Sequence, residues 1–325
     1  MAYSINGKTD LNRPMLYLTD NPVSAAPFPP RGTRWDKVPM TTLSEPDRAL
    51  WAVFGGAATV HKCEIPVSER VPCPARRIVL VDHAASSQFD VALAALGRGA
   101  DLPDGLICLA LEGARHRGQR SRPWSALRGN LHLTAHYRVD RGALSVESGL
   151  TMLPAVASAR AIRTASDGRA APGIKWVNDI LLDGQKVSGV LTATHVQGAT
   201  VERVLFGIGI NVECAPDIEP TPFVPAAGSL SKYGISLSRV FNAVVEELDA
   251  GMEALRAEGS SALFDAYRDM ADFIGRTVCI WPETCDDWNT AKPILTGPVR
   301  ALLPDLSLQI EGQATPIRKG RMSYC

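Results

Sequence analysis

The sequence predicts an α+β fold in which a mixed β-sheet, with packed helices on one side, is followed by a small C-terminal β-domain. Between residues 77 and 274, apolar runs typical of buried strands alternate with stretches of helical periodicity. An Asp183-Gly184 pair between two apolar runs indicates a β-hairpin. From Gly275 onward only short strand patterns occur. We therefore divide the chain into an N-terminal extension (1–74), a main domain (75–274) and a C-terminal domain (275–325).

Composition narrows the class of protein. A chain of 325 residues is long enough for two or three compact units with a sizeable core. Its 34 basic residues equal its 34 acidic ones, so nothing global indicates nucleic acid or an anionic membrane, and any cationic site must be local. Because there is no membrane-length apolar run and no hydrophobic signal core, we expect a cytoplasmic protein with no membrane partner.

The seven cysteines are odd in number and include no Cys-x-x-Cys pair. We expect reduced thiols, with neither a zinc site nor a disulfide framework.

The N-terminal extension, residues 1–74, is rich in proline and turn formers. We expect a partly irregular segment that packs on the main domain, and we find no chemistry in it. Paired helices with a basic second helix cannot be drawn there, so no DNA-binding segment is expected.

The main domain begins with a buried strand at residues 77–82, a helix at 89–96 and a second buried strand at 106–111. Residues 130–138 alternate between apolar and polar side chains, which predicts a half-buried strand. His132 and His136 share its polar face, but no carboxylate or thiol nearby completes a set of metal ligands.

Helical periodicity follows at residues 145–163, strands at 175–212, and two more helices after Ser238 and at Leu263 to Phe273. The strands expected in the C-terminal domain cover residues 277–281, 294–302, 306–310 and 315–324.

Two lysines and a carboxylate lie around the predicted hairpin. Lys175-Trp-Val-Asn-Asp179 precedes the Asp183-Gly184 turn, and Lys186-Val-Ser-Gly-Val-Leu191 follows it. A tight hairpin brings such groups together, so we expect the two ammonium groups to converge.

Two further segments favour a phosphate-bearing ligand. Residues 115–124, the arginine loop, carry four arginines and one histidine among residues that do not hold a helix, and end at Trp124. Gly207 and Gly209, in the run that ends at Asn211, leave one strand face without side chains, so backbone or ligand can approach closely there.

These three segments, in this order, resemble the biotin protein ligase family of the biotin/lipoate ligase superfamily. That family carries a Gly/Arg-rich loop ending in Trp, then Lys-Trp-Pro-Asn-Asp with Lys-x-x-Gly-x-Leu, then Gly-x-Gly-Ile-Asn. The resemblance extends over residues 77–325 and implies an SH3-like C-terminal barrel. It also implies a ligase that forms biotinyl-5'-AMP from biotin and ATP with Mg²⁺, and then biotinylates a lysine on the carrier domain of a carboxylase. A homodimer is compatible with it.

The resemblance gives the hairpin residues their roles. An acyl-adenylate forms by attack of a carboxylate on the α-phosphate of ATP, and the charge that develops needs fixed cations. Lys186 would hold the biotin carboxylate and the bridging phosphate region, and Lys175 the phosphates. Asp179 would hold Mg²⁺ or orient the acceptor amine; the alternative is that it caps a turn.

Residues of the arginine loop would hold the adenylate. Arg117 and Gly118 match the family's Arg-Gly pair, whereas Gln119 replaces its next arginine and His116 an earlier glycine. This departure removes a charge-assisted contact, for which the neighbouring Arg120 can compensate. The residues assigned to ATP or the adenylate are Arg117, Arg120, Arg122, Trp124, Asn178 and Asn211.

The biotin ureido ring would be recognised by Ser86, Ser87 and Gln88, which replace a Ser-Thr-Asn segment, and by Glu112 near the family's glutamine. The serines suit a helix N-cap equally well. The residues assigned to biotin are Ser86, Ser87, Gln88, Glu112, Arg117, Gly118, Gln119 and Lys186.

Two rival functions remain. One is a lipoate or octanoate ligase or transferase of the same superfamily, whose pocket needs no ureido partners. The other is a non-catalytic ligand- or carrier-binding protein, against which the retention of Lys175, Lys186 and Asp179 argues.

Overall fold

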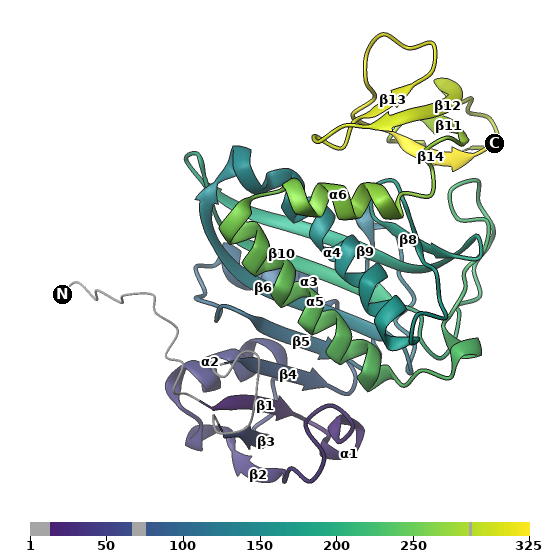
Figure 1. The fold of residues 1–325 in the computed structure, drawn as a ribbon. Coiled ribbons are helices and arrows are strands. Elements are labelled where there is room, and N and C mark those ends of the chain that lie inside the picture. The colour runs from purple at the N-terminus through teal and green to yellow at the C-terminus, as the bar shows by residue number, and fades with distance from the viewer. Residues whose placement is uncertain (1–13, 67–75, 286–287) are drawn as a thin grey trace.

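The computed structural model describes residues 14–66, 76–285 and 288–325 of the chain. The described residues form a ten-stranded mixed sheet and a four-stranded antiparallel sheet, with strand orders β2-β3-β1-β4-β5-β6-β10-β9-β8-β7 and β13-β12-β11-β14 (Figure 1). The strands are β1 (Met15–Thr19), β2 (Asp36–Pro39), β3 (Thr59–Ile65), β4 (Arg77–Val81), β5 (Leu106–Ala110), β6 (Leu131–Gly142), β7 (Gly173–Lys175), β8 (Asp179–Leu182), β9 (Gln185–Gln197), β10 (Thr200–Ile210), β11 (Thr277–Trp281), β12 (Leu295–Leu302), β13 (Leu308–Ile310) and β14 (Arg321–Tyr324).

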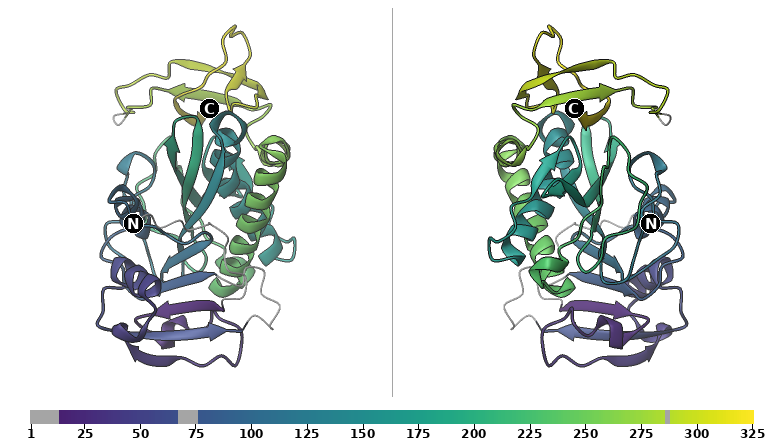
Figure 2. Two further views of the ribbon diagram at one scale, coloured as in Figure 1. Left: turned by 90° about the vertical axis from the view of Figure 1, so that its left-hand side faces the viewer. Right: turned by 90° about the vertical axis from the view of Figure 1, so that its right-hand side faces the viewer.

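Helices cover both faces of the large sheet. The helices are α1 (Pro22–Ala25), α2 (Glu45–Phe54), α3 (Gln88–Gly97), α4 (Ala143–Ala165), α5 (Leu237–Glu258) and α6 (Ser261–Met270), with 3₁₀ turns η1 (Met40–Thr42), η2 (Gln119–Ser121) and η3 (Ser231–Tyr233). Helices α4, α5 and α6 pack together on one face, and α2 and α3 lie on the other (Figure 2). The expectation of helices on one side was therefore wrong. Within the described residues, no helix is both long and apolar enough to cross a bilayer.

Most of the main-domain elements predicted from the sequence are confirmed within one or two residues, among them β4, α3, β5 and α5. The prediction of a half-buried β6 was wrong, because α3 and the loop that leads to Trp124 cover its second face. His132 is 5% exposed and His136 only 1%. Their ring nitrogens contact the carbonyl oxygens of Leu127 and Pro103, respectively.

The N-terminal segment is more regular than expected. Strand β1 pairs in parallel with β4 and antiparallel with β3, and β2 pairs with β3, so three strands extend the main sheet. All five residues of β1 are buried. A partly irregular extension was the wrong prediction for residues 14–66, because the prolines and turn formers are interspersed with short strands and helices, and the strands have distant pairing partners. Residues 1–13 and 67–74 of the predicted extension lie outside the described residues.

The predicted hairpin is confirmed. Leu182 of β8 pairs with Gln185 of β9, which leaves a two-residue loop. Its residues, Asp183 and Gly184, have φ angles of 52° and 77°. Positive φ at both central positions gives the type I′ turn that fits the twist of the flanking strands.

The C-terminal residues form a small antiparallel sheet, as predicted, and this sheet contacts the main domain. The Trp176 indole nitrogen donates to the carbonyl oxygen of Leu306 at 2.8 Å. Cys279 and Cys325 form a disulfide, so the expectation that all cysteines are reduced was wrong. The two cysteines are 46 residues apart, and only the pairing of β11 with β14 brings them together.

An ion pair between the buried Arg76, just before β4, and the partly buried Asp249 links α5 to the large sheet. Two Asp249 oxygens accept from the Arg76 guanidinium at 2.5 and 2.6 Å, and Oδ1 also accepts from the Tyr137 hydroxyl at 2.9 Å. Because Arg76 is 1% exposed, Asp249→Ala would leave a guanidinium charge in the protein interior. We expect this change to lower the free energy of unfolding by about 3 to 5 kcal/mol in urea titration.

Asp265→Ala is the matched control, because Asp265 pairs with Arg268 at the surface of α6. The control should cost less than about 1 kcal/mol. Equal losses in the two variants would contradict a structural role for the Arg76–Asp249 pair.

Candidate active site

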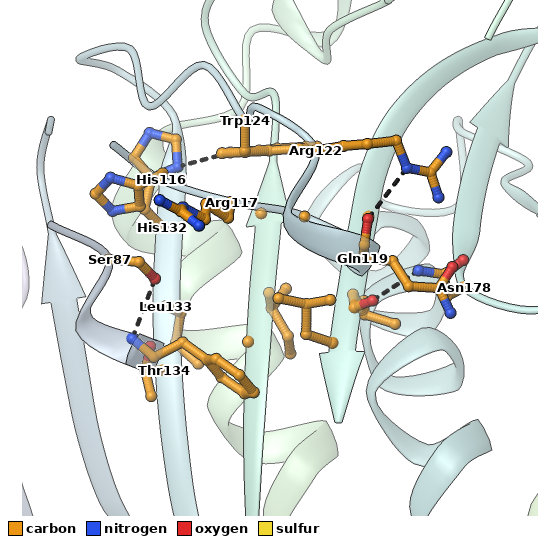
Figure 3. A pocket seen from close by; sticks show the side chains of 18 of the residues that line it. Ser87, His116, Arg117, Gln119, Arg122, Trp124, His132, Leu133, Thr134 and Asn178 are labelled. Carbon is orange, nitrogen blue, oxygen red and sulfur yellow. Dashed lines mark hydrogen bonds between the residues drawn. The ribbon is translucent and has the colours of Figure 1, made fainter. Parts of the chain in front are cut away.

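Two neighbouring cavities lie at one end of the large sheet. The first, of about 180 Å³, lies where α3, β6, β9 and β10 meet the arginine loop (Figure 3). It is lined by Ser87, Gln88, Phe89, His116, Arg117, Gly118, Gln119, Arg122, Pro123, Trp124, His132, Leu133, Thr134, Asn178, Asp179, Lys186, Gly189, Val190, Leu191, Gly207, Ile208, Gly209 and Val224. Its lining combines apolar residues with polar groups, which suits an organic ligand with a polar ring.

The second cavity, of about 720 Å³, lies between the main domain and the C-terminal sheet. Six cationic side chains line it, against four carboxylates: Arg120, Arg122, Lys175, Arg318, Lys319 and Arg321 against Glu147, Asp179, Glu283 and Asp305. Gln119, Arg122, Asn178 and Asp179 line both cavities, so the two are contiguous. An excess of fixed cations suits a polyanionic ligand.

Lys186, Asp179 and Lys175 lie at the junction of the cavities. The antiparallel pairing of β7, β8 and β9 holds them, and Lys175 pairs directly with Asp179. Lys186 Nζ lies 2.5 Å from Asp179 Oδ1. The Lys175 ammonium, 4% exposed, donates to the Phe223 carbonyl oxygen. Burial lowers the pKa of Lys175; the Asp179 carboxylate opposes this shift and the Lys186 charge adds to it.

The Asp179 carboxylate pairs with Lys186. The neighbouring Asn178 amide donates to the Val190 carbonyl oxygen at 2.8 Å, and the Asn178 carbonyl oxygen accepts from the Val190 backbone N–H at 3.0 Å. These two bonds hold Asp179 beside β9. No group of three or more metal-binding side chains occurs in the described part of the chain.

The glycines of β10 admit two aromatic side chains. A Cβ atom on Gly209 would lie 2.4 Å from the Trp124 indole, and one on Gly207 would lie 3.0 Å from the Phe89 ring. Trp124 therefore packs flat on the strand, where the Lys186 ammonium lies 5.9 Å from its ring centre. The close approach expected at these glycines is made by side chains of the protein itself.

A histidine helps to hold Trp124. The Trp124 indole N–H donates to His132 Nδ1 at 3.4 Å, so Nε2 of His132 carries the ring proton and donates to the Leu127 carbonyl oxygen at 3.0 Å (Figure 3). Burial lowers the pKa of His132 to about 4, so the ring is neutral at physiological pH. His116 lies 5.7 Å from it, ring centre to ring centre.

Ser87 and Gln88 provide polar groups next to α3. The Ser87 hydroxyl accepts from the Phe89 backbone N–H at 3.2 Å, so Ser87 is the helix N-cap and lines the first cavity as well. Gln88 is 4% exposed, and its side-chain oxygen has no hydrogen-bond partner among the described residues. A buried acceptor without a partner is costly, so this oxygen suits a ligand that donates.

The cavities bring together most of the predicted site residues but not all of them. The Glu112 carboxylate pairs with Arg128 at 3.0 Å and faces His83, and Arg128 lowers its pKa. Asn211 is buried and donates to the Gly228 carbonyl oxygen at 2.9 Å. Glu112, Asn211 and Ser86 line neither of these two cavities, so their contact with the ligand stays a prediction that the cavities do not support.

Several lining residues were missed from the sequence. The alternation of apolar and polar residues in β6 placed His132 and Thr134 on one face of the strand, but we expected that face to be only partly buried. Arg318 and Arg321 reach the second cavity from the C-terminal domain, and no local pattern places them beside Lys175. Arg120 lines only the second cavity.

Fold and site together define an α+β protein with two contiguous cavities, one suited to an organic ligand and the other to a polyanion. The model of the biotin/lipoate A/B protein ligase family matches residues 98–211. A biotin–acetyl-CoA-carboxylase ligase of Mycobacterium tuberculosis is 31% identical over 213 residues, which cover 62% of this chain and 74% of that protein. The chain belongs to this family.

Other relatives match over shorter stretches. A Paracoccus denitrificans protein described as a biotin–acetyl-CoA-carboxylase ligase is 39% identical over 125 residues, covering 37% of this chain and 52% of its own. Escherichia coli bifunctional ligase/repressor BirA is 27% identical over 186 residues, which cover 56% of this chain and 57% of that protein. The chain thus spans about half the length of these two relatives.

A solved structure has the same fold. Biotin protein ligase from Aquifex aeolicus, in complex with biotin and ATP, aligns with a TM-score of 0.57 at 19% identity. The alignment covers 76% of this chain and 97% of that one.

Proposed function

We propose that this protein is an ATP-dependent biotin–protein ligase that forms biotinyl-5'-AMP and transfers the biotinyl group to a lysine of a carboxylase carrier domain. The observation that carries the proposal is the Lys186–Asp179–Lys175 group at the junction of an apolar-lined cavity and a cationic one. The names of the relatives from Mycobacterium and Paracoccus support the same activity.

In the first step, a carboxylate oxygen of biotin attacks the α-phosphorus of ATP. The new P–O bond forms as the bond to the β-phosphate bridging oxygen breaks, and pyrophosphate leaves with that electron pair. Lys186 lines the first cavity and would hold the carboxylate and the α-phosphate. Lys175, Arg122 and Arg321 line the second cavity and would hold the remaining phosphates. Because these cations are in place before the reaction, they would stabilise the negative charge of the transition state and so lower the activation barrier for adenylate formation.

In the second step, the acceptor lysine amine attacks the acyl carbonyl carbon, AMP leaves, and the amine loses a proton. Asp179 would orient that amine, and its position in the lining of both cavities supports this role. It is also the residue that would hold Mg²⁺, which prefers one or two carboxylates together with substrate phosphates. A bound Mg²⁺ would neutralise phosphate charge.

The polar groups of the first cavity favour biotin over lipoate or octanoate. A cyclic urea offers two N–H donors and a carbonyl acceptor. The unpaired oxygen of Gln88 suits one of those donors, and the hydroxyls of Ser87 and Thr134 line the same cavity. The apolar side chains of Leu133, Val190 and Ile208 suit the acyl tail.

We also propose that the C-terminal sheet corresponds to the SH3-like domain of the family. Its four short antiparallel strands, and the contact of Leu306 with Trp176 beside Lys175, support this assignment.

The test of the proposed function is pyrophosphate release from ATP with biotin, lipoate or octanoate, followed by transfer to a carrier domain. We expect pyrophosphate release with biotin but not with lipoate or octanoate. Turnover of lipoate or octanoate instead would move the protein to the rival ligase class, and no release with any acid would favour a non-catalytic binding protein.

Replacement of Gln88 by alanine should raise the KM for biotin by about tenfold and leave the KM for ATP unchanged, because a hydrogen bond to a buried group is worth about 1 to 3 kcal/mol. Ser87→Ala should act in the same direction. Glu112→Ala is the control, since Glu112 lies outside both cavities. A biotin KM that moves in the control but not in Gln88→Ala would contradict this assignment.

A further inference from the structure

The tip of the arginine loop, residues 117–122, forms part of the wall of both cavities. Arg117 and Gly118 line the first, Arg120 lines the second, and Gln119 and Arg122 line both. A ligand that occupies the two cavities would therefore lie beneath this tip, and its escape would depend on how firmly the tip is held.

The tip makes few hydrogen bonds to the rest of the protein. The Gly118 backbone N–H donates to the Arg122 carbonyl oxygen at 2.7 Å, and Arg122 Nε donates to the Gln119 carbonyl oxygen at 3.1 Å, both within the tip. Among the described residues, the tip's hydrogen bonds and ion pairs to other segments all come from Arg120. Its guanidinium contacts both the carboxylate and the carbonyl oxygen of Glu283, in the C-terminal domain.

The backbone beside this contact is strained. Arg120 and Ser121 have φ angles of 59° and 57°, in the left-handed region that residues with a Cβ atom seldom adopt. Such a conformation persists only where surrounding contacts hold it. Besides the hydrogen bonds within the tip, the contacts of Arg120 with Glu283 are the ones that hold it to another segment of the described chain.

We propose that Arg120 and Glu283 form an interdomain latch that holds the tip over the acyl-adenylate between the two chemical steps. The inference rests on the proposed function, because the adenylate is the species that the latch retains. Arg120 and Glu283 are positioning residues: they act on the intermediate through the loop rather than by contact with the reacting atoms. Because Gln119 replaces an arginine that would contact the adenylate, the latch rather than that arginine retains the adenylate in this protein.

The first experiment probes the loop without any chemistry. Glu283→Ala leaves every arginine of the loop in place, so the trypsin cleavage sites are unchanged. Cleavage of the native protein within residues 115–122 should become about fivefold faster, as expected for the loss of a partly exposed ion pair; the backbone carbonyl oxygen of residue 283, which also accepts from Arg120, is kept in this variant. Glu311→Ala is the matched control, because it breaks the exposed Arg300–Glu311 pair of the same sheet and should leave cleavage unchanged.

The second experiment follows pyrophosphate release from biotin and ATP without an acceptor protein. A retained adenylate limits each molecule to one rapid turnover, so the amplitude of the burst reports adenylate formation and the slower rate that follows reports escape. Glu283→Ala should keep the burst and raise the later rate about fivefold. Arg120→Glu combined with Glu283→Arg should restore the slow rate, since the swap restores the ion pair.

The latch is wrong if Glu283→Ala matches Glu311→Ala in both cleavage and later rate, or if the charge-swapped variant does not restore the slow rate. A wild-type protein that releases pyrophosphate steadily without a burst would also contradict the latch, because its adenylate is not retained. A wild-type protein that releases no pyrophosphate would refute the proposed function instead, and the cleavage experiment would still decide whether the loop is latched.

Discussion

Replacement of Lys186 by alanine is expected to lower the rate of biotinyl-adenylate formation by about a thousandfold. The ammonium group lies at the junction of the two cavities, and removal of one preorganised charge-stabilising group from a site of this kind costs about a hundred- to a thousandfold. The change should alter the free energy of unfolding by less than about 1 kcal/mol, because Lys186 retains contact with water. Single-turnover pyrophosphate release and urea titration measure the two quantities.

Lys232→Ala is the matched control. Lys232 pairs with Asp183 in the turn of the same hairpin and is 57% exposed, so its loss removes a nearby charge without touching either cavity. The control should react at the wild-type rate. If Lys186→Ala reacts at a similar rate, Lys186 does not stabilise the transition state.

The second large effect is expected at Lys175 and depends on pH. Burial lowers the pKa of this ammonium below the ordinary lysine value of 10.5. Because the cation is the form that stabilises phosphate charge, adenylate formation should fall as the pH rises through this lowered pKa. Lys175→Met should abolish the alkaline limb of the pH profile and lower the plateau by about a hundredfold.

The same shift has a consequence for stability. The pKa of Lys175 is lower in the folded protein than in the unfolded chain, so between these two pKa values the unfolded chain binds more protons. The free energy of unfolding therefore rises with pH over this interval. The wild type should therefore gain stability relative to Lys175→Met over that interval in urea titrations. A pH-independent difference, together with an unchanged rate profile, would contradict a shifted Lys175.

Local patterns were sufficient to predict the hairpin and most main-domain elements. The Asp183-Gly184 turn needs only two residues that tolerate positive φ, and α5 has a serine N-cap, a regular apolar stripe and a glycine stop at Gly259. The two lysines followed from the same hairpin, since strand pairing places them next to Asp179. Signals of this kind lie within a few residues of the structure that they predict.

Features that depend on distant segments were not predictable. Nothing near β6 shows that α3 and Trp124 cover its second face, and nothing near Glu112 shows that Arg128 binds its carboxylate. The second cavity needs two domains, and the Cys279–Cys325 disulfide needs two strands that pair only in the folded C-terminal sheet. The family motifs identified the arginine loop, but the contact of Arg120 with Glu283 lies outside any motif.

The three N-terminal strands also protect the large sheet from intermolecular pairing. Strand β4 (Arg-Ile-Val-Leu-Val) is apolar after its first residue, and β1 occupies the hydrogen-bonding edge that it would otherwise present to other molecules. The edge strand of the sheet is therefore β2. This strand, Asp-Lys-Val-Pro, is short and mostly exposed, carries two charged residues and ends at a proline. Charges and proline on an edge strand oppose the addition of a strand from another chain. Residues 14–66 thus act against aggregation of a sheet whose chemistry takes place near its opposite edge.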